Sequence, residues 1–351
     1  MNNYSLPTRF NESYYKDVIS EKYYYDLILL RNEIKRSVDD FFLNKINAVN
    51  VDLFMMTNSI SSPMGSGSDS LPIEFKFGKE STFLTDSAQF GFEPIILSGL
   101  SKLYCYLPSL RGEDSDARHL NQFYHCEYEG LGTLEDVICI VEGLIENLAN
   151  KLLKHQSILS KLSRNNELTI LLLKSLIKTT EFKKITFDNA VALLNKNSLK
   201  NLVIHNQNGI DISPKGEIIL SKLLNTKLPF WITHYDRDRV PFYQKPQLEN
   251  PDKVLNADLI CPPLFDNSFG GEVVGAGQRQ DSVTEIQDSL KRQKVNMKNY
   301  EWYVDLRRVP TYQTTAGFGL GVERFITWIL GLNDIKYSTI YPRIKDLKIT
   351  P

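Results

Sequence analysis

The stretch Ala316-Gly317-Phe318-Gly319-Leu320-Gly321-Val322-Glu323-Arg324 places three glycines at every second position near the end of the chain. Alternate residues of a β-strand face the same side, so these glycines would clear one face of a sheet for a flat ligand or another backbone. The apolar run from Phe325 to Leu332 is typical of a buried helix, with Gly331 near its C-terminal cap. We therefore expect Glu323 and Arg324 at a strand-to-helix junction. The spacing does not fit the dinucleotide fingerprint G-x-G-x-x-G, and tight packing of the strand on a helix is the alternative.

The composition is that of a globular protein with ample core. The 351 residues are 42% hydrophobic and 24% charged, enough for one large domain or two ordinary ones. A net charge of -1 gives no basic footprint for nucleic acid, although a local patch is still compatible with tRNA. The four cysteines form no C-x-x-C pair and are expected to be free thiols. Without a signal segment or a membrane-spanning apolar run, the protein is expected to be cytoplasmic, with no membrane partner.

Hydrophobic periodicity predicts an α+β fold around an antiparallel sheet, with helices outside. Long helices are expected at about 20–46, 133–162 and 282–295. The second and third begin with capping boxes at Thr133 and Ser282. Strands are expected around 53–56, 102–107, 122–128, 230–233, 242–243, 258–260 and 272–274.

No linker or repeat marks a convincing domain boundary. Residues 1–18 are predicted to be an N-terminal arm, and 19–351 one domain. Within that domain, about 165–228 is predicted to be a mostly helical insertion with little chemistry of its own. The turn-rich segment 59–69 is either a connector or a loop that gates a ligand.

A predicted hairpin carries the first group of candidate site residues. Arg111 and Glu113 are two positions apart, so one face can carry both a cation and a carboxylate. On the return strand, four residues share that parity: His119, Phe123, His125 and Glu127. Such a surface suits a nucleotide, because arginine binds phosphate in bidentate fashion and an aromatic ring stacks on a base. The alternative is a hairpin with surface ion pairs and one core phenylalanine.

The segment 270–279 is the second group. Glu272 is a candidate ligand of Mg²⁺, with Asp258 as its partner on a nearby strand. Arg279 follows Glu272 by seven residues, and odd spacing puts the two on opposite faces of a regular strand. They can serve one site only if the run 275–277 bends or bulges. The alternative is a glycine-rich turn with solvated charges.

Together these segments resemble the catalytic domain of class II aminoacyl-tRNA synthetases, especially the asparaginyl group and its asparagine synthetase-like relatives. The segments 110–113 and 118–123 resemble motif 2 of that family, and 317–324 resembles motif 3. The segments 271–279 and 300–308 are similar to the asparaginyl subgroup. The resemblance runs from about residue 25 to the end. It implies an antiparallel sheet flanked by helices, and a homodimer formed through the long N-terminal helix and the strand after it.

The resemblance also implies ATP and Mg²⁺ as cofactors and assigns residues to them. Arg111 and Arg324 would be catalytic. ATP would be bound by Arg111, Glu113, Arg118, His119, Leu120, Phe123, Glu272, Gly321 and Arg324. Mg²⁺ would be held by Asp258 and Glu272. The amino acid would be bound by Ser87, Gln89 and Glu127 at its ammonium end and by Arg279 at its far end. The substrate carboxylate would attack the α-phosphorus directly, to form an acyl adenylate and pyrophosphate, with positioning and charge neutralisation from the protein.

The chain departs from the synthetases in four places. Only a short arm precedes the catalytic part, so the family's N-terminal anticodon-binding domain is expected to be absent. Asn58 stands at the motif 1 proline position, and Phe92 at the position of a lysine in aspartyl enzymes. In the segment 64–69, Gly65 stands where the synthetases have a glutamate that anchors the α-amino group. The pattern around this loop is similar to ammonia-dependent asparagine synthetases instead.

These departures favour an AMP-forming amide ligase similar to asparagine synthetase. In this hypothesis Arg279 binds the α-carboxylate of aspartate, the β-carboxylate is activated, and ammonia or another amine attacks β-aspartyl adenylate. The alternative is an asparaginyl-tRNA synthetase-like enzyme that charges tRNA or another acceptor, which makes tRNA a possible but not favoured partner. A non-catalytic paralogue is the third possibility, and the intact set Arg111, Glu113, Glu272 and Arg324 argues against it.

Overall fold

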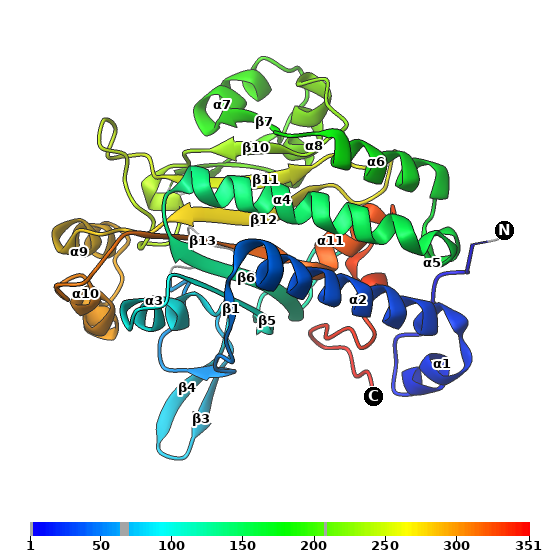
Figure 1. Ribbon diagram of the computed structural model, residues 1–351, viewed down its shortest axis with the longest axis horizontal. Helices are drawn as coiled ribbons and strands as arrows, with labels where there is room; N and C mark the ends of the chain where they lie inside the picture. Colours follow the sequence, from blue (N-terminus) through cyan, green and yellow to red (C-terminus); the bar gives the residue numbers. More distant parts are fainter. Residues whose placement is uncertain (1–2, 64–69, 207–208) are drawn as a thin grey trace.

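The computed structural model describes residues 3–63, 70–206 and 209–351 (Figure 1). Its centre is an eight-stranded sheet in the order β1-β5-β6-β13-β12-β11-β10-β7. Neighbouring strands are antiparallel except at the two edges, where β1 pairs with β5 and β7 pairs with β10 in parallel. The predicted α+β class with an antiparallel sheet flanked by helices is confirmed. The strands of this sheet are β1 (Val49–Asn50), β5 (Lys102–Leu110), β6 (Gln122–Leu131), β7 (Lys183–Thr186), β10 (Phe230–Thr233), β11 (Asn256–Cys261), β12 (Gly271–Gln278) and β13 (Thr315–Gly321).

Two long helices, α2 (Lys22–Asp40) and α4 (Leu134–Leu152), lie across one face of this sheet (Figure 1). α2 continues as a π-helical segment to Ile46, and α4 begins at the predicted capping box formed by Thr133 and Asp136. The remaining α-helices are α1 (Tyr14–Ser20), α3 (Gln89–Leu97), α5 (Gln156–Leu162), α6 (Asn166–Lys178), α7 (Phe187–Asn195), α8 (Pro214–Leu223), α9 (Val283–Arg292), α10 (Glu301–Leu306) and α11 (Val322–Ile329). Smaller elements complete the fold: the sheet of β2 (Met56–Thr57), β3 (Glu74–Phe77) and β4 (Glu80–Leu84), and the hairpin of β8 (Val203–Asn206) and β9 (Gly209–Ile212).

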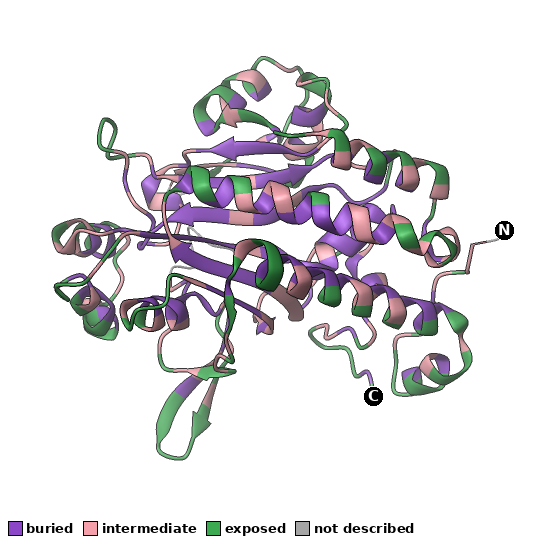
Figure 2. Ribbon diagram, in the orientation of Figure 1, coloured by how far each residue is buried: buried purple, intermediate pink, exposed green. Residues whose placement is uncertain are grey.

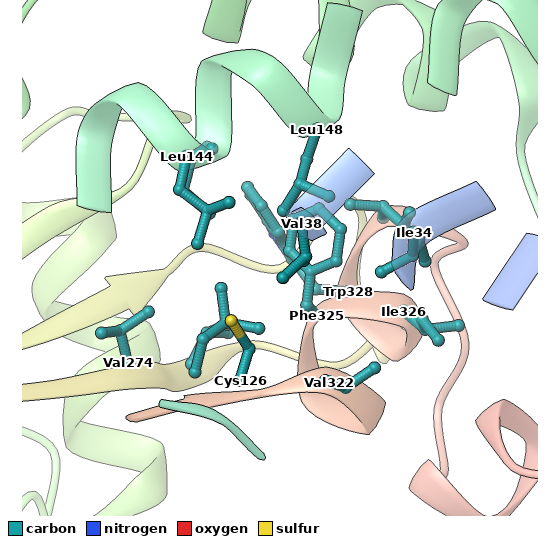
Figure 3. Packing of buried hydrophobic residues seen from close by; sticks show 14 of the residues in the cluster. Ile34, Val38, Cys126, Leu144, Leu148, Val274, Val322, Phe325, Ile326 and Trp328 are labelled. Carbon is teal, nitrogen blue, oxygen red and sulfur yellow. The ribbon is translucent and has the colours of Figure 1, made fainter. Parts of the chain in front are cut away.

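The main hydrophobic core fills the space between the sheet and the helices α2, α4 and α11 (Figures 2 and 3). Cys126 of β6 and Val274 of β12 point into it from the sheet, opposite Val38 of α2 and Leu148 of α4. Trp328 of α11 is fully buried there and donates its indole N–H to the carbonyl of Pro262 at 2.8 Å. Because side chains alternate along each strand, the residues between these core positions face the opposite side of the sheet. That side is the one available for a site.

The glycine stretch forms the predicted strand and helix, as β13 and α11. Phe318 and Leu320 of β13 belong to the core, so the three alternating glycines lie on the opposite face. An ideal Cβ on Gly319 would have no atom closer than 3.8 Å, and one on Gly321 none closer than 3.6 Å. These two glycines therefore leave open space above the sheet. Gly331, with a φ of 63°, follows the end of α11 in the left-handed region that favours glycine.

β12 contains the bulge that Arg279 requires, at a different place from the predicted one. In the pairing of β11 with β12, Leu259 lies opposite Val274 and Ile260 lies opposite Glu272, so Val273 is the extra residue. The pairing from Val274 to Gln278 is regular. The predicted bend at 275–277 is therefore wrong, because a bulge two residues earlier already changes the parity. Glu272 and Arg279 consequently share one face of the sheet.

Other expectations from sequence need correction. Of the strand predicted at 53–56, only Met56 lies in a strand, β2, and residues 53–55 belong to the connection between β1 and β2. Residues 242–243, also predicted to be a strand, lie in a turn. The region 165–228 contains the predicted helices, but it also adds β7 to the edge of the large sheet and forms the hairpin β8–β9. The expected arm packs against the body of the protein. Its Tyr4 hydroxyl donates to Asp26 of α2 at 2.6 Å, and Tyr14 is fully buried.

All four cysteines are free thiols: Cys105, Cys126 and Cys261 are buried, and Cys139 is exposed. Burial raises the pKa of Cys105, and the nearby Glu127 carboxylate adds to this effect. Such buried thiols are unreactive packing groups. Across the part of the chain that the structure describes, no helix is both long enough and apolar enough to span a membrane.

Gly317 tolerates no side chain, in contrast to its neighbour Gly319. A Cβ on Gly317 would overlap the Glu129 carboxylate and the backbone carbonyl of Tyr128. We predict that Gly317→Ala lowers the free energy of unfolding by about 1–3 kcal/mol, the usual cost of overpacking a filled site. Gly319→Ala is the matched control with a change of less than about 1 kcal/mol. The measurement is a urea titration of each variant. If the two variants lose the same free energy of unfolding, the prediction is wrong.

Candidate active site

A cavity of about 330 Å³ opens on the sheet face opposite α2 and α4. Strands β6, β12 and β13 form its floor, and the loops around residues 61, 87 and 240 form part of its wall. Every site residue predicted from the sequence lines this one cavity: Ser87, Gln89, Arg111, Glu113, Arg118, His119, Leu120, Phe123, Glu127, Asp258, Glu272, Arg279, Gly321 and Arg324.

One end of the cavity combines an aromatic ring with a cation. The guanidinium carbon of Arg111 lies 5.3 Å from the ring centroid of Phe123. Glu113 accepts a hydrogen bond from the backbone N–H of Leu71 at 3.1 Å. Among the described residues, the buried Nε of Arg111 has no hydrogen-bond partner. A buried, unpaired guanidinium nitrogen is costly, so this end favours an anionic or strongly accepting ligand.

Two further arginines at the cavity are each paired with a carboxylate. Arg324, in the first turn of α11, lies 3.2 Å from Glu272 of β12, measured from Nη1 to Oε2. Arg118 lies 2.8 Å from Glu217 of α8, measured from Nη2 to Oε2. Burial pushes the pKa of Glu272 up, but Arg324 and Arg118 outweigh burial and hold this pKa below its usual value. Both guanidinium groups are thus charged and available at the cavity edge for phosphate oxygens.

His119 lies at the same end of the cavity. Its Nδ1 is 2.8 Å from the Asp116 carboxylate. Burial lowers the pKa of His119, and the positive charge of Arg324 lowers it further, against the opposing effect of Asp116. His119 is therefore mostly a neutral hydrogen-bonding group near neutral pH.

Two carboxylates converge above β12. An ideal Cβ on Gly275 would lie 3.6 Å from Asp258 Oδ1 and 3.6 Å from Glu272 Oε1. Burial raises the pKa of Asp258, and the negative charge of Glu272 raises it further, although the Tyr235 hydroxyl bonds to the ionised form. Among the described residues, no group of three His, Cys, Asp or Glu side chains is placed to hold a metal ion. Two close carboxylates that repel each other nevertheless fit Mg²⁺, which takes one or two carboxylates together with phosphate oxygens and water.

A buried carboxylate marks the far half of the cavity floor. Glu127 accepts the Ser87 hydroxyl at 2.8 Å and the Ala88 N–H at 3.0 Å. Burial alone would raise the pKa of Glu127, but the hydrogen bond from His125 outweighs burial, with help from Ala88 and Ser87. The pKa is therefore lowered and Glu127 is ionised, which suits an ammonium group.

Beyond Glu127, Arg279 forms a buried ion pair with Glu129. The Nη2–Oε2 distance is 2.8 Å, and Nε lies 3.1 Å from both carboxylate oxygens. Arg279 is 4% exposed and Glu129 is 0% exposed. Burial disfavours the arginine's charge, but Glu129 raises the pKa of Arg279 well above its ordinary value. Arg279 also donates to the side-chain oxygen of Gln89, which lines the cavity with it.

Sequence reasoning missed two of these partners. Glu129 follows Glu127 by two residues on β6, so alternation places its side chain on the same face as Phe123 and Glu127. The sequence pattern could therefore have identified it. Glu217 had no such signal, because it comes from the region 165–228 and meets Arg118 only in the folded chain. The predicted change at Gly65 lies outside the described residues. Phe92 is fully buried in a separate apolar cluster and does not line the cavity.

Several known proteins with similar sequences are asparagine–tRNA ligases. The chain is 31% identical over 274 residues to the one from Pyrococcus abyssi, which covers 77% of this chain and 58% of that protein. It is 30% identical over 322 residues to the one from Pelotomaculum thermopropionicum, covering 91% and 69%. The chain thus spans a little over half the length of the Pyrococcus relative.

Solved structures give the same picture. Asparaginyl-tRNA synthetase from Pyrococcus horikoshii complexed with asparaginyl-adenylate has a TM-score of 0.83 at 25% identity, covering 97% of this chain and 73% of that one. The Entamoeba histolytica asparaginyl-tRNA synthetase has a TM-score of 0.80 at 25% identity, covering 97% and 72%.

These comparisons contradict the main functional hypothesis from sequence, an amide ligase similar to asparagine synthetase. The relatives are named for the ligation of asparagine to tRNA, which was the alternative. The geometry agrees, because the Arg279 charge assigned to the α-carboxylate of aspartate is already neutralised by Glu129. The family described as tRNA synthetases class II (D, K and N) matches residues 6–345, nearly the whole chain, so the protein belongs to that family.

Proposed function

We propose that the protein activates asparagine with ATP to form asparaginyl adenylate and then transfers the asparaginyl group to tRNA. The names of the relatives support both halves of this reaction. The structural observation that carries the proposal is the buried pair of Arg279 and Glu129 at the far end of the cavity.

The charge of this pair favours a neutral amide over a carboxylate. A lone buried arginine would compensate a second carboxylate on the substrate, as in aspartate. Here Glu129 already compensates Arg279, so the aspartate side chain would bring an unpaired negative charge into a dry site. The amide of asparagine brings no charge, and its oxygen can still accept a hydrogen bond from the guanidinium. The pocket therefore favours asparagine because a second negative charge, the side-chain carboxylate of aspartate, would have no partner there.

The proposed chemistry needs positioning and charge neutralisation, with no covalent link to the protein. Glu127 and Ser87 bind the ammonium group of asparagine and direct its α-carboxylate toward the α-phosphorus of ATP. A carboxylate oxygen then bonds to that phosphorus, and pyrophosphate leaves with the electron pair of the broken P–O bond. Arg111 neutralises charge at the α-phosphate, while Arg324 holds the γ-phosphate end.

Three further residues contact ATP in this proposal. Phe123 stacks on the adenine, Glu113 accepts hydrogen bonds from it, and His119 joins Arg324 at the γ-phosphate. Magnesium, held by Asp258 and Glu272, would supply further charge neutralisation at the phosphate oxygens.

The expected homodimer stays a proposal. β1 is one of the two edge strands of the large sheet, and among the described residues it pairs only with β5. Its Val49 is exposed, as are Ile28 of α2 and Leu43 of the helical segment that follows α2. An edge strand beside exposed apolar side chains is suited to pairing with a second copy of the chain.

The function is tested by offering the enzyme both amino acids. We expect asparagine to support ATP–pyrophosphate exchange with a kcat/KM at least tenfold above that for aspartate. We also expect labelled asparagine to become attached to asparagine tRNA in the presence of ATP and Mg²⁺. A mixture of aspartate, ammonium and ATP without tRNA serves as the control. Formation of asparagine and AMP in that mixture, with no charging of tRNA, would contradict the proposal.

Neutralising Glu129 should change the preference between the two amino acids. In Glu129→Gln the charge of Arg279 is uncompensated, so an aspartate side chain becomes its natural partner. We predict that the ratio of kcat/KM for asparagine to that for aspartate falls by about tenfold or more, which corresponds to about 1.4 kcal/mol. The control is Glu127→Gln, which weakens binding of the ammonium group and should reduce both values together. An unchanged ratio in Glu129→Gln rules out selection by charge.

Magnesium should stabilise the protein through the two carboxylates that repel each other. With ATP present, we predict that Mg²⁺ raises the melting temperature of the wild type, and that Asp258→Asn needs about tenfold more Mg²⁺ for the same shift. The reason is that this substitution removes one of two anionic ligands. Asp266→Asn is the matched control, because it neutralises a carboxylate that is 92% exposed on the surface. Equal Mg²⁺ dependence of both variants would contradict the assignment.

A further inference from the structure

His125 occupies the centre of the cavity floor and has no role in the function described so far. It lies on β6 between Phe123 and Glu127, on the same face, and its register partner on β13 is Gly321. An ideal Cβ on Gly319 would lie 3.8 Å from His125 Cδ2 and 3.9 Å from Nε2. The Nε2 edge of the imidazole therefore projects over the bare glycine floor. Among the described residues, Nε2 has no hydrogen-bond partner.

The other ring nitrogen is fixed by two neighbours. His125 Nδ1 lies 2.8 Å from the hydroxyl oxygen of Ser109 and 3.2 Å from Oε1 of Glu127. Glu127 accepts hydrogen bonds from Ser87 and Ala88, so it is a carboxylate with lone pairs only. If Nδ1 carried no proton, its lone pair would face and repel the lone pairs of the Glu127 carboxylate. The proton of the neutral imidazole therefore sits on Nδ1, and Nε2 keeps its lone pair toward the cavity.

The position along β6 places Nε2 near the bond that must break in the second half of the reaction. In an adenylate, the acyl–phosphate linkage lies between the adenosine and the amino acid. The proposed contacts place adenine at Phe123 and the ammonium group at Glu127. These residues are four positions apart on one strand, about 13–14 Å, and His125 is midway. The acyl carbon is only two bonds from the ammonium nitrogen, and His125 Nδ1 lies 3.2 Å from Oε1 of Glu127, so an adenylate bound by these contacts would have its acyl carbon beside His125.

We propose that His125 is a further catalytic residue, whose Nε2 takes the proton from the ribose hydroxyl of the acceptor as that hydroxyl attacks the acyl carbon. This inference rests on the proposed function. The hydroxyl oxygen bonds to the acyl carbon, and the bond from that carbon to the phosphate oxygen breaks. The electron pair leaves with AMP, and the proton moves to Nε2 and then to solvent. A positioned general base of this kind accelerates proton transfer by about 10²–10⁴-fold.

The charged groups around the imidazole come from three elements. Glu127 is on the same strand, Arg111 follows β5 and lies over Phe123, and Arg324 begins α11 beside Gly321. Ser109 and Phe123 contribute no charge. Because a general base acts only while its accepting nitrogen is unprotonated, the transfer rate should fall at low pH.

The test separates adenylate formation from transfer. His125→Asn keeps an amide N–H near the position of Nδ1, which can still donate to Glu127, but it has no atom at Nε2. Asparagine-dependent pyrophosphate exchange measures the first step. Single-turnover transfer from preformed enzyme-bound adenylate to asparagine tRNA, between pH 5.5 and 8.5, measures the second. We expect the ratio of transfer rate to exchange rate to fall at least 30-fold in His125→Asn, and the decline of transfer at low pH to disappear.

Three outcomes overturn the assignment, and they can be told apart. If exchange and transfer fall by the same factor, His125 only positions Glu127. If His125→Asn transfers at the wild-type rate and keeps the decline at low pH, another group accepts the proton. If the wild type forms the adenylate but transfers asparagine to no tRNA, the proposed function fails and the assignment fails with it.

Discussion

The buried ion pair between Arg279 and Glu129 is the interaction on which the rest of the site depends. Leaving either partner alone in a dry site would cost several kcal/mol, so both must be present and in contact. Three features make the contact possible. The extra residue Val273 turns Arg279 to the cavity face, the alternation of β6 turns Glu129 to the same face, and the missing side chain at Gly317 leaves room for both. The pair thus joins Glu129 of β6 to Arg279, directly after β12, across the intervening strand β13.

Much of this arrangement follows from the sequence by alternation alone. The glycines of β13, and Phe123 and Glu127 of β6, lie on the predicted face, because one face of the sheet must bury its apolar residues under α2 and α4. The position of the bulge did not follow. Glycines at 275 and 277 suggested a bend there, but the register with β11 is set by the whole sheet. Partners from distant segments were equally hidden: Glu217 reaches Arg118 across 99 residues, and Glu129 reaches Arg279 across 150.

Glu129, the partner that the sequence pattern did not assign to Arg279, also explains why the first functional hypothesis was wrong. Arg279 considered alone is a receptor for a carboxylate, and an amino acid with two carboxylates is then the natural substrate. With Glu129 behind it, the same arginine belongs to a neutral pair that donates hydrogen bonds without adding net charge. In the proposed function, the preference for asparagine over aspartate therefore rests on Glu129, a residue that does not line the cavity. Such a residue is hard to assign from a motif, because it acts on the ligand only through its neighbour.

The opposite end of the cavity follows the same rule with a different result. Arg118 and Arg324 are also paired with carboxylates, but Glu217 and Glu272 leave them at the cavity edge with part-exposed side chains. A triphosphate carries more charge than one carboxylate and offers bidentate oxygens, so it can compete for both guanidinium groups. Arg279 and its partner Glu129 are both buried, whereas Arg324 and its partner Glu272 are both partly exposed. In the proposed function, burial therefore decides whether a paired arginine selects a neutral group or remains available to an anion.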